Sequence, residues 1–159
     1  MVILILFINS AIFSFSEQDA DASGSLSRAM AEKIIEFIDG AFRFKWTKAF
    51  MDNLAMYFEH PLRKAAHFTE YAVLGSVITL MLKQWYKTSK GLYFFITLWV
   101  FLTAFFDELH QYFVPGRYAS FFDVLLDTAG GFFGIFVTIK LFDFLIKRAK
   151  ERSSNKNNK

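Results

Sequence analysis

The sequence contains no cysteine, which excludes disulfides, thiolate metal sites and a cysteine nucleophile. It has only two prolines and no G-x-S-x-G, P-loop or H-E-x-x-H motif, so the common signatures of hydrolases, nucleotide-binding proteins and zinc proteases are absent. Apolar and aromatic side chains are abundant instead: 54% of the 159 residues are hydrophobic and 22 are Phe. Long apolar runs in such a composition predict a membrane protein, with residues 1–159 forming a single domain.

Four apolar segments predict an all-α, four-helix membrane bundle, with spans at about 1–15, 62–84, 91–114 and 119–146. The first segment is short, because about 20 residues are needed to cross the hydrocarbon core. A cleaved signal peptide is the alternative for it, since the sequence ADA at 20–22 matches a small-x-small cleavage site. No Lys or Arg precedes the segment, so we expect a retained helix.

The two prolines predict boundaries between these segments. Pro61 suits the first turn of the second span. Pro115 and Gly116 form a dipeptide typical of a tight turn, which would fold the start of the fourth span back against the end of the third.

Residues 26–58, between the first two spans, carry two apolar stripes at helical spacing. The first stripe is Leu26, Met30, Ile34, Phe37 and Ala41, and the second is Trp46, Phe50, Met51, Leu54, Tyr57 and Phe58. They predict two amphipathic helices, the first ending near Asp39 and Gly40. Two arrangements stay open: the helices lie on the membrane surface, or they pack on the bundle.

Basic residues predict the orientation of the chain in the membrane. The connection at 83–90 has three Lys and no acidic residue, and the tail at 150–159, expected to be disordered, is also basic. Short basic segments stay in the cytoplasm, so both termini are expected inside a plasma membrane that the chain crosses several times. A basic tail beside an apolar segment indicates a membrane flank, and we expect no nucleic-acid partner.

With this topology, polar groups from several spans gather at the outer face. They are Ser16, Glu17 and Gln18 at the end of the first span; His67 and Glu70 in the second; Asp107, Glu108, His110 and Gln111 in the third; Arg117 in the turn; and Ser120, Asp123 and Asp127 in the fourth. An ionisable group costs about 2.5–3.5 kcal/mol at the bilayer centre, so this gathering needs a reason. It predicts a polar cleft open to the outside.

Asp123 and Asp127 lie one helical turn apart and would repel each other if both were ionised. They therefore need a cation, a proton or hydrogen bonds, and the candidate partners are Lys64, Arg63, His67 and Arg117. A charge network that only locks the helices together is the structural alternative. Gly130 and Gly134 form a GxxxG pattern, which we attribute to close helix packing.

The remaining polar residues have plainer interpretations. Glu108 is expected to be solvated at the interface, and His110 to be an interfacial histidine. We predict no cofactor and no metal; His67 with Glu70, beside Asp123 or Asp127, is the combination that could ligate a cation.

Two segments carry a family resemblance. KAAHFTEYAVLG at 64–75 and DELHQYFVPGRYASFFDVLLDTAGGFFG at 107–134 resemble the VanZ-like family of small bacterial membrane proteins, and FSFSEQ at 13–18 is similar to the end of that family's first helix. The resemblance extends to about residue 146 and implies a bacterial plasma-membrane protein; the founding members are associated with teicoplanin resistance. The motif residues are Lys64, His67, Tyr71, Asp107, Glu108, Gln111, Arg117, Ser120 and Asp123. Where the family usually has Asn, this chain has Asp127.

Two functions follow as hypotheses. The first, which we favour, is a non-enzymatic protein that binds an amphiphile at the outer leaflet: a lipid-linked wall precursor, an anionic lipid or a lipoglycopeptide. The predicted ligand-binding residues are Lys64, His67, Glu70, Tyr71, Asp107, Glu108, Gln111, Arg117, Ser120, Asp123 and Asp127. The second is a membrane hydrolase or transferase acting on a lipid-linked substrate, possibly metal-assisted, whose candidate catalytic residues are His67, Asp107, Asp123 and Asp127. The sequence predicts no oligomeric state.

Overall fold

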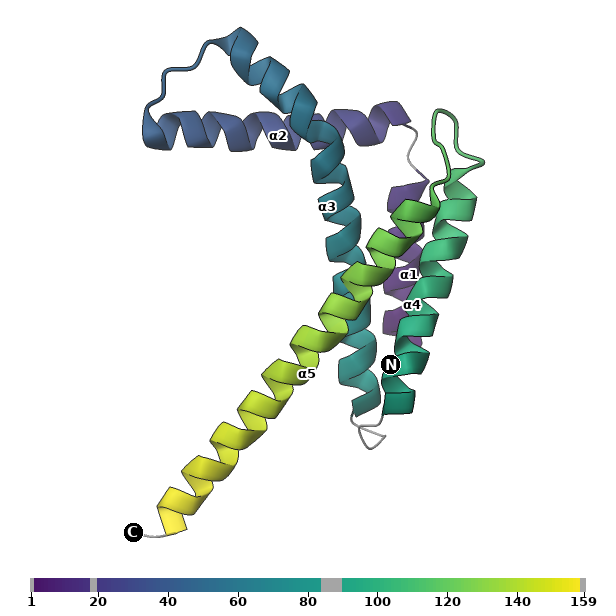
Figure 1. The fold of residues 1–159 in the computed structure, drawn as a ribbon, viewed down its shortest axis with the longest axis vertical. Helices are drawn as coiled ribbons and strands as arrows, with labels where there is room; N and C mark the ends of the chain where they lie inside the picture. Colours follow the sequence, from purple (N-terminus) through teal and green to yellow (C-terminus); the bar gives the residue numbers. More distant parts are fainter. Residues whose placement is uncertain (1, 18–19, 84–89, 158–159) are drawn as a thin grey trace.

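The computed structural model describes residues 2–17, 20–83 and 90–157, and these residues form five helices and no strand. The helices are α1 (Val2–Ser16), α2 (Ala20–Phe42), α3 (Lys48–Lys83), α4 (Lys90–Gln111) and α5 (Phe121–Asn157) (Figure 1). Within the described residues, three segments are long and apolar enough to cross a membrane: Lys48–Lys83, Gly91–Gln111 and Phe121–Arg152. The predicted all-α membrane fold is confirmed.

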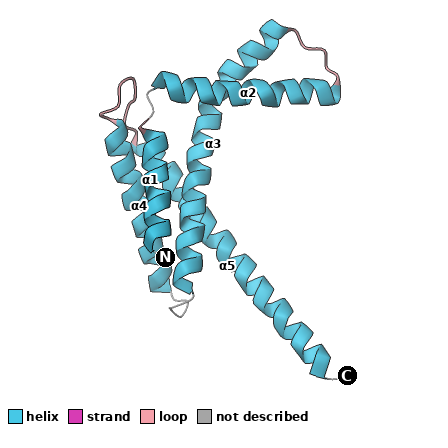
Figure 2. Cartoon of the chain, turned by 180° about the vertical axis from the view of Figure 1, so that it is seen from behind, coloured by secondary structure: helices cyan, strands magenta, loops and turns pink. Residues whose placement is uncertain are grey.

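The helix α1 lies beside α4 (Figures 1 and 2). Its 15 residues extend only about 22 Å at 1.5 Å per residue, against a hydrocarbon core of about 30 Å. A complete crossing by α1 therefore stays a prediction. Its contribution to the bundle is definite, because Ile12 is buried in the core and Ser16 is fully buried at the end of the helix.

The helix α3 is continuous over 36 residues and contains Pro61. The predicted helix start at Pro61 is wrong: the second amphipathic segment and the second span are one helix. A proline inside a helix removes one backbone donor and crowds the preceding turn, which bends a helix that packing otherwise holds together. Figure 1 shows α3 changing direction along its length. The helix begins instead at Lys48 and is capped by Thr47, whose Oγ1 accepts a hydrogen bond of 3.3 Å from the Phe50 N–H.

The helix α2 lies across the direction of α1 and α4 (Figure 1). It ends at Phe42, slightly beyond the predicted end at Asp39 and Gly40. The next residue, Arg43, takes a left-handed conformation with φ 56°. Asp39 Oδ1 accepts a 2.9 Å hydrogen bond from the Trp46 N–H and fixes the connection to α3.

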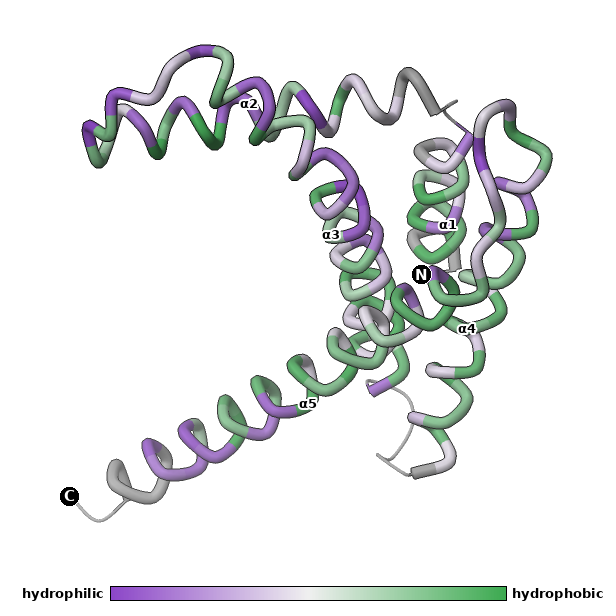
Figure 3. Tube along the Cα trace, turned by 45° about the horizontal axis from the view of Figure 1, so that its top comes forward, coloured by the Kyte–Doolittle hydropathy of each residue, from purple (hydrophilic) through white to green (hydrophobic). Residues whose placement is uncertain are grey.

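The face of α2 that packs on α3 is not its predicted apolar stripe. The buried residues of α2 include Ser23, Gly24, Ser27, Ala31 and Ile35, and Ala31 and Ile35 form a small core with Ala55 of α3. The predicted stripe points away from the protein: Leu26, Met30, Ile34 and Phe37 are 45–76% exposed. Hydrophilic residues gather along α2, the adjoining part of α3 and the far end of α5 (Figure 3). A helix with one face on protein and an apolar face outward suits the membrane surface, which stays a prediction for α2.

Glycines allow α5 to cross α3 at backbone contact. A Cβ on Gly130 would meet the Phe68 carbonyl, one on Gly134 would meet the Ala72 carbonyl, and Gly75 opposes Gly131. The packing role predicted for the GxxxG pattern is confirmed. Beside this crossing lies the bundle core, whose fully buried members include Tyr71, Leu74 and Val100.

Beyond the crossing, α5 diverges from the other helices (Figure 1). It stays helical through Asn157, so the disorder predicted for 150–159 is wrong for the described part of that tail. Lys83 Nζ lies 3.4 Å from Asp143 Oδ1 and ties the end of α3 to α5. Both termini lie towards the end of the molecule opposite the turn that joins α4 to α5 (Figure 1).

Candidate functional site

The turn between α4 and α5 sets the geometry of the site. The Arg117 N–H donates to the Val114 carbonyl at 3.1 Å, and Gly116 has φ 75°. Proline second and a positive-φ glycine third are the features of a type II turn, so the predicted turn is confirmed. It returns the chain so that α5 begins beside the end of α4.

Glu108 anchors the start of α5. Its Oε1 accepts a 2.7 Å hydrogen bond from the Ser120 N–H, next to the first residue of α5, where a negative charge is favourable. Glu108 is 5% exposed, so the prediction of a solvated side chain is wrong. The sequence could not reveal this, because the partner is a backbone group twelve residues away.

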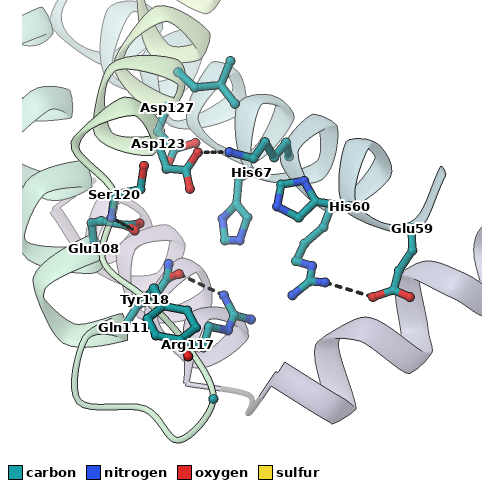
Figure 4. A pocket seen from close by; sticks show the side chains of 14 residues that line it. Glu59, His60, His67, Glu108, Gln111, Arg117, Tyr118, Ser120, Asp123 and Asp127 are labelled. Carbon is teal, nitrogen blue, oxygen red and sulfur yellow. Dashed lines mark hydrogen bonds and ion pairs between the residues drawn. The ribbon is translucent and has the colours of Figure 1, made fainter. Parts of the chain in front are cut away.

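A cavity of about 560 Å³ lies between α3, α4, the turn and α5 (Figure 4). Its lining residues are Glu59, His60, Arg63, Lys64 and His67 from α3; Glu108 and Gln111 from α4; Gly116, Arg117 and Tyr118 from the turn; and Ser120, Asp123, Leu126 and Asp127 at α5. Most of the predicted ligand-binding residues therefore surround one space. The exceptions are Glu70, Tyr71 and Asp107, which do not line it.

Glu59 and His60 were missed by sequence reasoning. Pro61 was taken as a helix start, which separated these two residues from Lys64 and His67. In one continuous helix, His60, Lys64 and His67 are spaced i, i+4 and i+7 and share a face. The spacing of these three residues could have revealed the shared face, but His60 lies before the proline and the other two lie after it.

Two ion pairs lie among the residues that line the cavity (Figure 4). Lys64 of α3 pairs with Asp123 of α5, and each side chain is 29% exposed. Arg63 Nη2 lies 3.0 Å from Glu59 Oε1, one turn away on the same helix. Lys64 is thus the cation that neutralises Asp123, one of the partners that the sequence proposed.

Asp107 lies behind the cavity in a network of buried hydrogen bonds. Its Oδ2 accepts from Ser16 Oγ at 2.8 Å and from Gln111 Nε2 at 3.2 Å. Arg117 Nη1 in turn donates to Gln111 Oε1 at 2.9 Å. The network joins α1, α4 and the turn, and Gln111 connects it to the cavity. Ser16, which the sequence placed at the depth of the cleft but not among the ligand-binding residues, is a direct partner of the buried carboxylate.

His67, Asp107 and Asp127 converge from α3, α4 and α5. One possible ligand atom from each lies within 4.8 Å of the other two. Glu70 Oε2 is 3.7 Å from His67 Nδ1, on the neighbouring turn. An imidazole and two carboxylates in this arrangement can hold a cation or exchange protons. This set differs from the combination that the sequence offered for a cation, because Asp107 takes the place of Glu70, and Asp127 rather than Asp123 takes part.

His110 lies apart from this cluster, as the sequence predicted. It is exposed, and its ring packs edge-on against Phe13 at 6.2 Å between centroids.

Comparison with known proteins agrees with the resemblance noted in the sequence. A family model described as VanZ/LLP1 matches residues 1–144, which include all the lining residues of the cavity. No curated protein and no solved structure matches the chain. A match over this share of the sequence, joined to three helices able to cross a membrane, identifies the chain as a membrane protein that belongs to the VanZ/LLP1 family.

Proposed function

We propose that this protein binds the anionic head group of an amphiphile in the cavity between α3, α4 and α5. The observation that carries the proposal is the presence of three cationic side chains, Arg63, Lys64 and Arg117, around one cavity of a membrane protein. Arginine presents a planar fork that matches the oxygens of phosphate or carboxylate, and lysine adds a point charge. Lys64 and Arg63 are held by partly exposed carboxylates, and such pairs exchange readily for a ligand because they contribute little.

Apolar surface next to the cavity supports a ligand with a hydrocarbon tail. A second cavity of about 140 Å³ shares Glu108 and Ser120 with the first. Its other lining residues are apolar: Phe105, Leu109, Ala119, Phe121 and Val124. Tyr118, Phe121 and Phe122 are 65–88% exposed around the start of α5. A head group in the larger cavity would thus have its tail beside aromatic and aliphatic side chains.

The chemical class of the ligand is an anionic lipid, a lipid-linked wall precursor or a lipoglycopeptide. Membership of a VanZ-type family supports a link with resistance. That the resistance is to teicoplanin-type glycopeptides, and that the membrane is a bacterial plasma membrane, are parts of this proposal. In the orientation expected from the basic residues, the cavity opens at the outer face, where wall precursors and glycopeptides meet the membrane.

Native mass spectrometry of the detergent-purified protein, followed by titration with short-chain phosphatidylglycerol, tests the proposal. We expect a co-purified anionic lipid and saturable binding that Arg63→Gln and Lys64→Gln weaken about tenfold or more, since hydrogen bonds to charged groups contribute about 1.5–3 kcal/mol. Lys140→Gln is the matched control, because Lys140 is exposed on α5 and does not line the cavity. The proposal would be refuted if all three variants had the melting temperature of the unaltered chain and bound phosphatidylglycerol with the same affinity as that chain.

The convergence of His67, Asp107 and Asp127 favours a second function, that of a membrane hydrolase or transferase on a lipid-linked substrate. In that case one of the carboxylates would act as the base and His67 as the acid or as a metal ligand. Turnover of a lipid-linked pyrophosphate that Asp127→Asn abolishes, while phosphatidylglycerol binding persists, would favour the enzyme over the binding protein.

A further inference from the structure

Two carboxylates in the cluster of His67, Asp107 and Asp127 are buried inside the bundle. Asp107 is 0% and Asp127 3% exposed. Among the residues that the structure describes, the Oδ1 atoms of both have no hydrogen-bond partner. A buried polar atom left without a partner is costly, and a buried charge is more so unless a counter-charge or a metal accompanies it. Lys64, a cation on the same wall, is already paired with Asp123.

We infer that His67, Asp107 and Asp127 form a binding site for a divalent cation at the inner wall of the cavity. The three residues come from three different helices, and their possible ligand atoms already lie within 4.8 Å of one another. An ion there would supply positive charge to both orphaned oxygens. His67 and Asp127 line the cavity, so the ion would remain accessible from it.

The neighbours of these residues suit the role of supporting groups. Ser16 and Gln111 donate to Asp107 Oδ2, which fixes that carboxylate and leaves Oδ1 for the ion. Glu70 Oε2 lies 3.7 Å from His67 Nδ1, which is beyond hydrogen-bond distance, and would orient the imidazole ring once metal binding brought the two closer. Metal ligands are commonly held in this way by hydrogen-bonding and carboxylate partners.

The donor set favours Mn²⁺ or Zn²⁺ over Ca²⁺. One imidazole nitrogen with two carboxylates is a mixed nitrogen and oxygen set, whereas Ca²⁺ takes six to eight oxygens. Metal–ligand distances of about 2.0–2.2 Å require the three atoms to close in on the ion. Binding would therefore draw α3, α4 and α5 together, and it should raise the melting temperature of the whole chain.

The test uses the metal alone, so it does not depend on head-group binding. The full chain in detergent, stripped with a chelator, is titrated with Mn²⁺ and followed by electron paramagnetic resonance and thermal melting. We expect one Mn²⁺ per chain, displaced by Zn²⁺, and a higher melting temperature in the bound form. Asp127→Asn and His67→Gln should each weaken Mn²⁺ binding more than about tenfold. Asp143→Asn is the control, because Asp143 is an exposed carboxylate on the same helix, α5. This variant should bind Mn²⁺ as the unaltered chain does.

Two results would overturn the inference. One is the absence of saturable Mn²⁺ and Zn²⁺ binding by the folded, unaltered chain. The other is unchanged Mn²⁺ affinity in the Asp127→Asn and His67→Gln variants. Phosphatidylglycerol binding measured with chelator present reports on the proposed head-group function separately, so the failure of one idea is distinguishable from the failure of the other.

Discussion

Asp107 shows how a carboxylate is kept inside this bundle. It is completely buried, yet one of its oxygens receives hydrogen bonds from two helices, α1 through Ser16 and α4 through Gln111. Gln111 can donate to Asp107 and accept from Arg117 at the same time because its amide offers both functions. The residues behind the cavity therefore support the residues that line it, and α1 belongs to the site through one serine.

Ser16→Ala tests this connection at the scale of one hydroxyl. The change removes a hydrogen bond from a fully buried carboxyl group, for which we expect a loss of about 1–3 kcal/mol in the free energy of unfolding. Ser14→Ala is the matched control, because Ser14 is an exposed serine on the same helix. Thermal and denaturant melts of the two variants in detergent give the comparison. If both variants have the same melting temperature and denaturant midpoint as the unaltered chain, the network around Asp107 does not stabilise the fold.

At the scale of elements, the close crossing of α3 and α5 determines where the cavity forms. Gly130 and Gly134 bring the backbones into contact, and the ends of the two helices then separate on either side. On one side of the crossing, α3 and the first turns of α5 frame the cavity with α4. On the other side α5 leaves the bundle. The glycines thus influence the site although none of those at the crossing lines it.

Gly134→Ala should open this crossing. The added Cβ would overlap the Ala72 carbonyl, which is backbone and cannot turn aside. We expect the variant to lose about 1–3 kcal/mol of stability or more, as overpacked cores do. Gly40→Ala is the control: its Cβ would meet nothing within 4 Å, and in a helix alanine is favoured over glycine by about 0.5–1 kcal/mol. A Gly134→Ala protein as stable as the Gly40→Ala protein would show that the crossing is looser than described.

The elements also show which features the sequence could predict. Apolar length predicted four spans, and three of the described helices are long and apolar enough to cross a membrane. Local chemistry predicted the turn at Pro115 and Gly116, because the signal for a turn is contained in the segment itself. Pro61 misled because a proline marks a helix start only where no packing carries the helix through it. The apolar stripe on α2 was predicted, but its environment was left open, because a pattern specifies an apolar face without saying whether protein or lipid covers it. Its exposure in the structure favours the membrane surface over packing on the bundle.

Within the site, spacing predicted which residues share a helix face, and the basic segments predicted that the polar ends of the spans meet. Partners that depend on tertiary geometry stayed hidden, such as Ser16 for Asp107 and a backbone N–H for Glu108. No metal was predicted, and the combination considered for a cation was His67 with Glu70, beside Asp123 or Asp127, because His67 and Glu70 neighbour each other in sequence. The observed cluster draws instead on three helices.

At the scale of the whole molecule, the cavity and α2 lie at the same end, and both termini lie towards the other (Figure 1). If α2 lies along the membrane surface, its exposed stripe of Leu26, Met30, Ile34 and Phe37 would rest among the lipid head groups. The cavity would then open at the depth of those head groups. The depth of the cavity in the membrane is inferred from the shape of the protein. The side of the membrane on which the cavity opens is inferred from the basic residues alone.

Labelling of single cysteines tests the side on which the cavity opens. The chain has no cysteine, so each introduced thiol is the only one present. Ala41 is exposed near the end of α2, and Ala149 is exposed near the end of α5. In intact cells, a membrane-impermeant maleimide should label Ala41→Cys but leave Ala149→Cys unmodified until the membrane is permeabilised. Labelling of both from outside would show that the chain does not separate these ends across the membrane. Labelling of Ala149→Cys alone would reverse the orientation and place the cavity, and any amphiphile that it binds, at the cytoplasmic face.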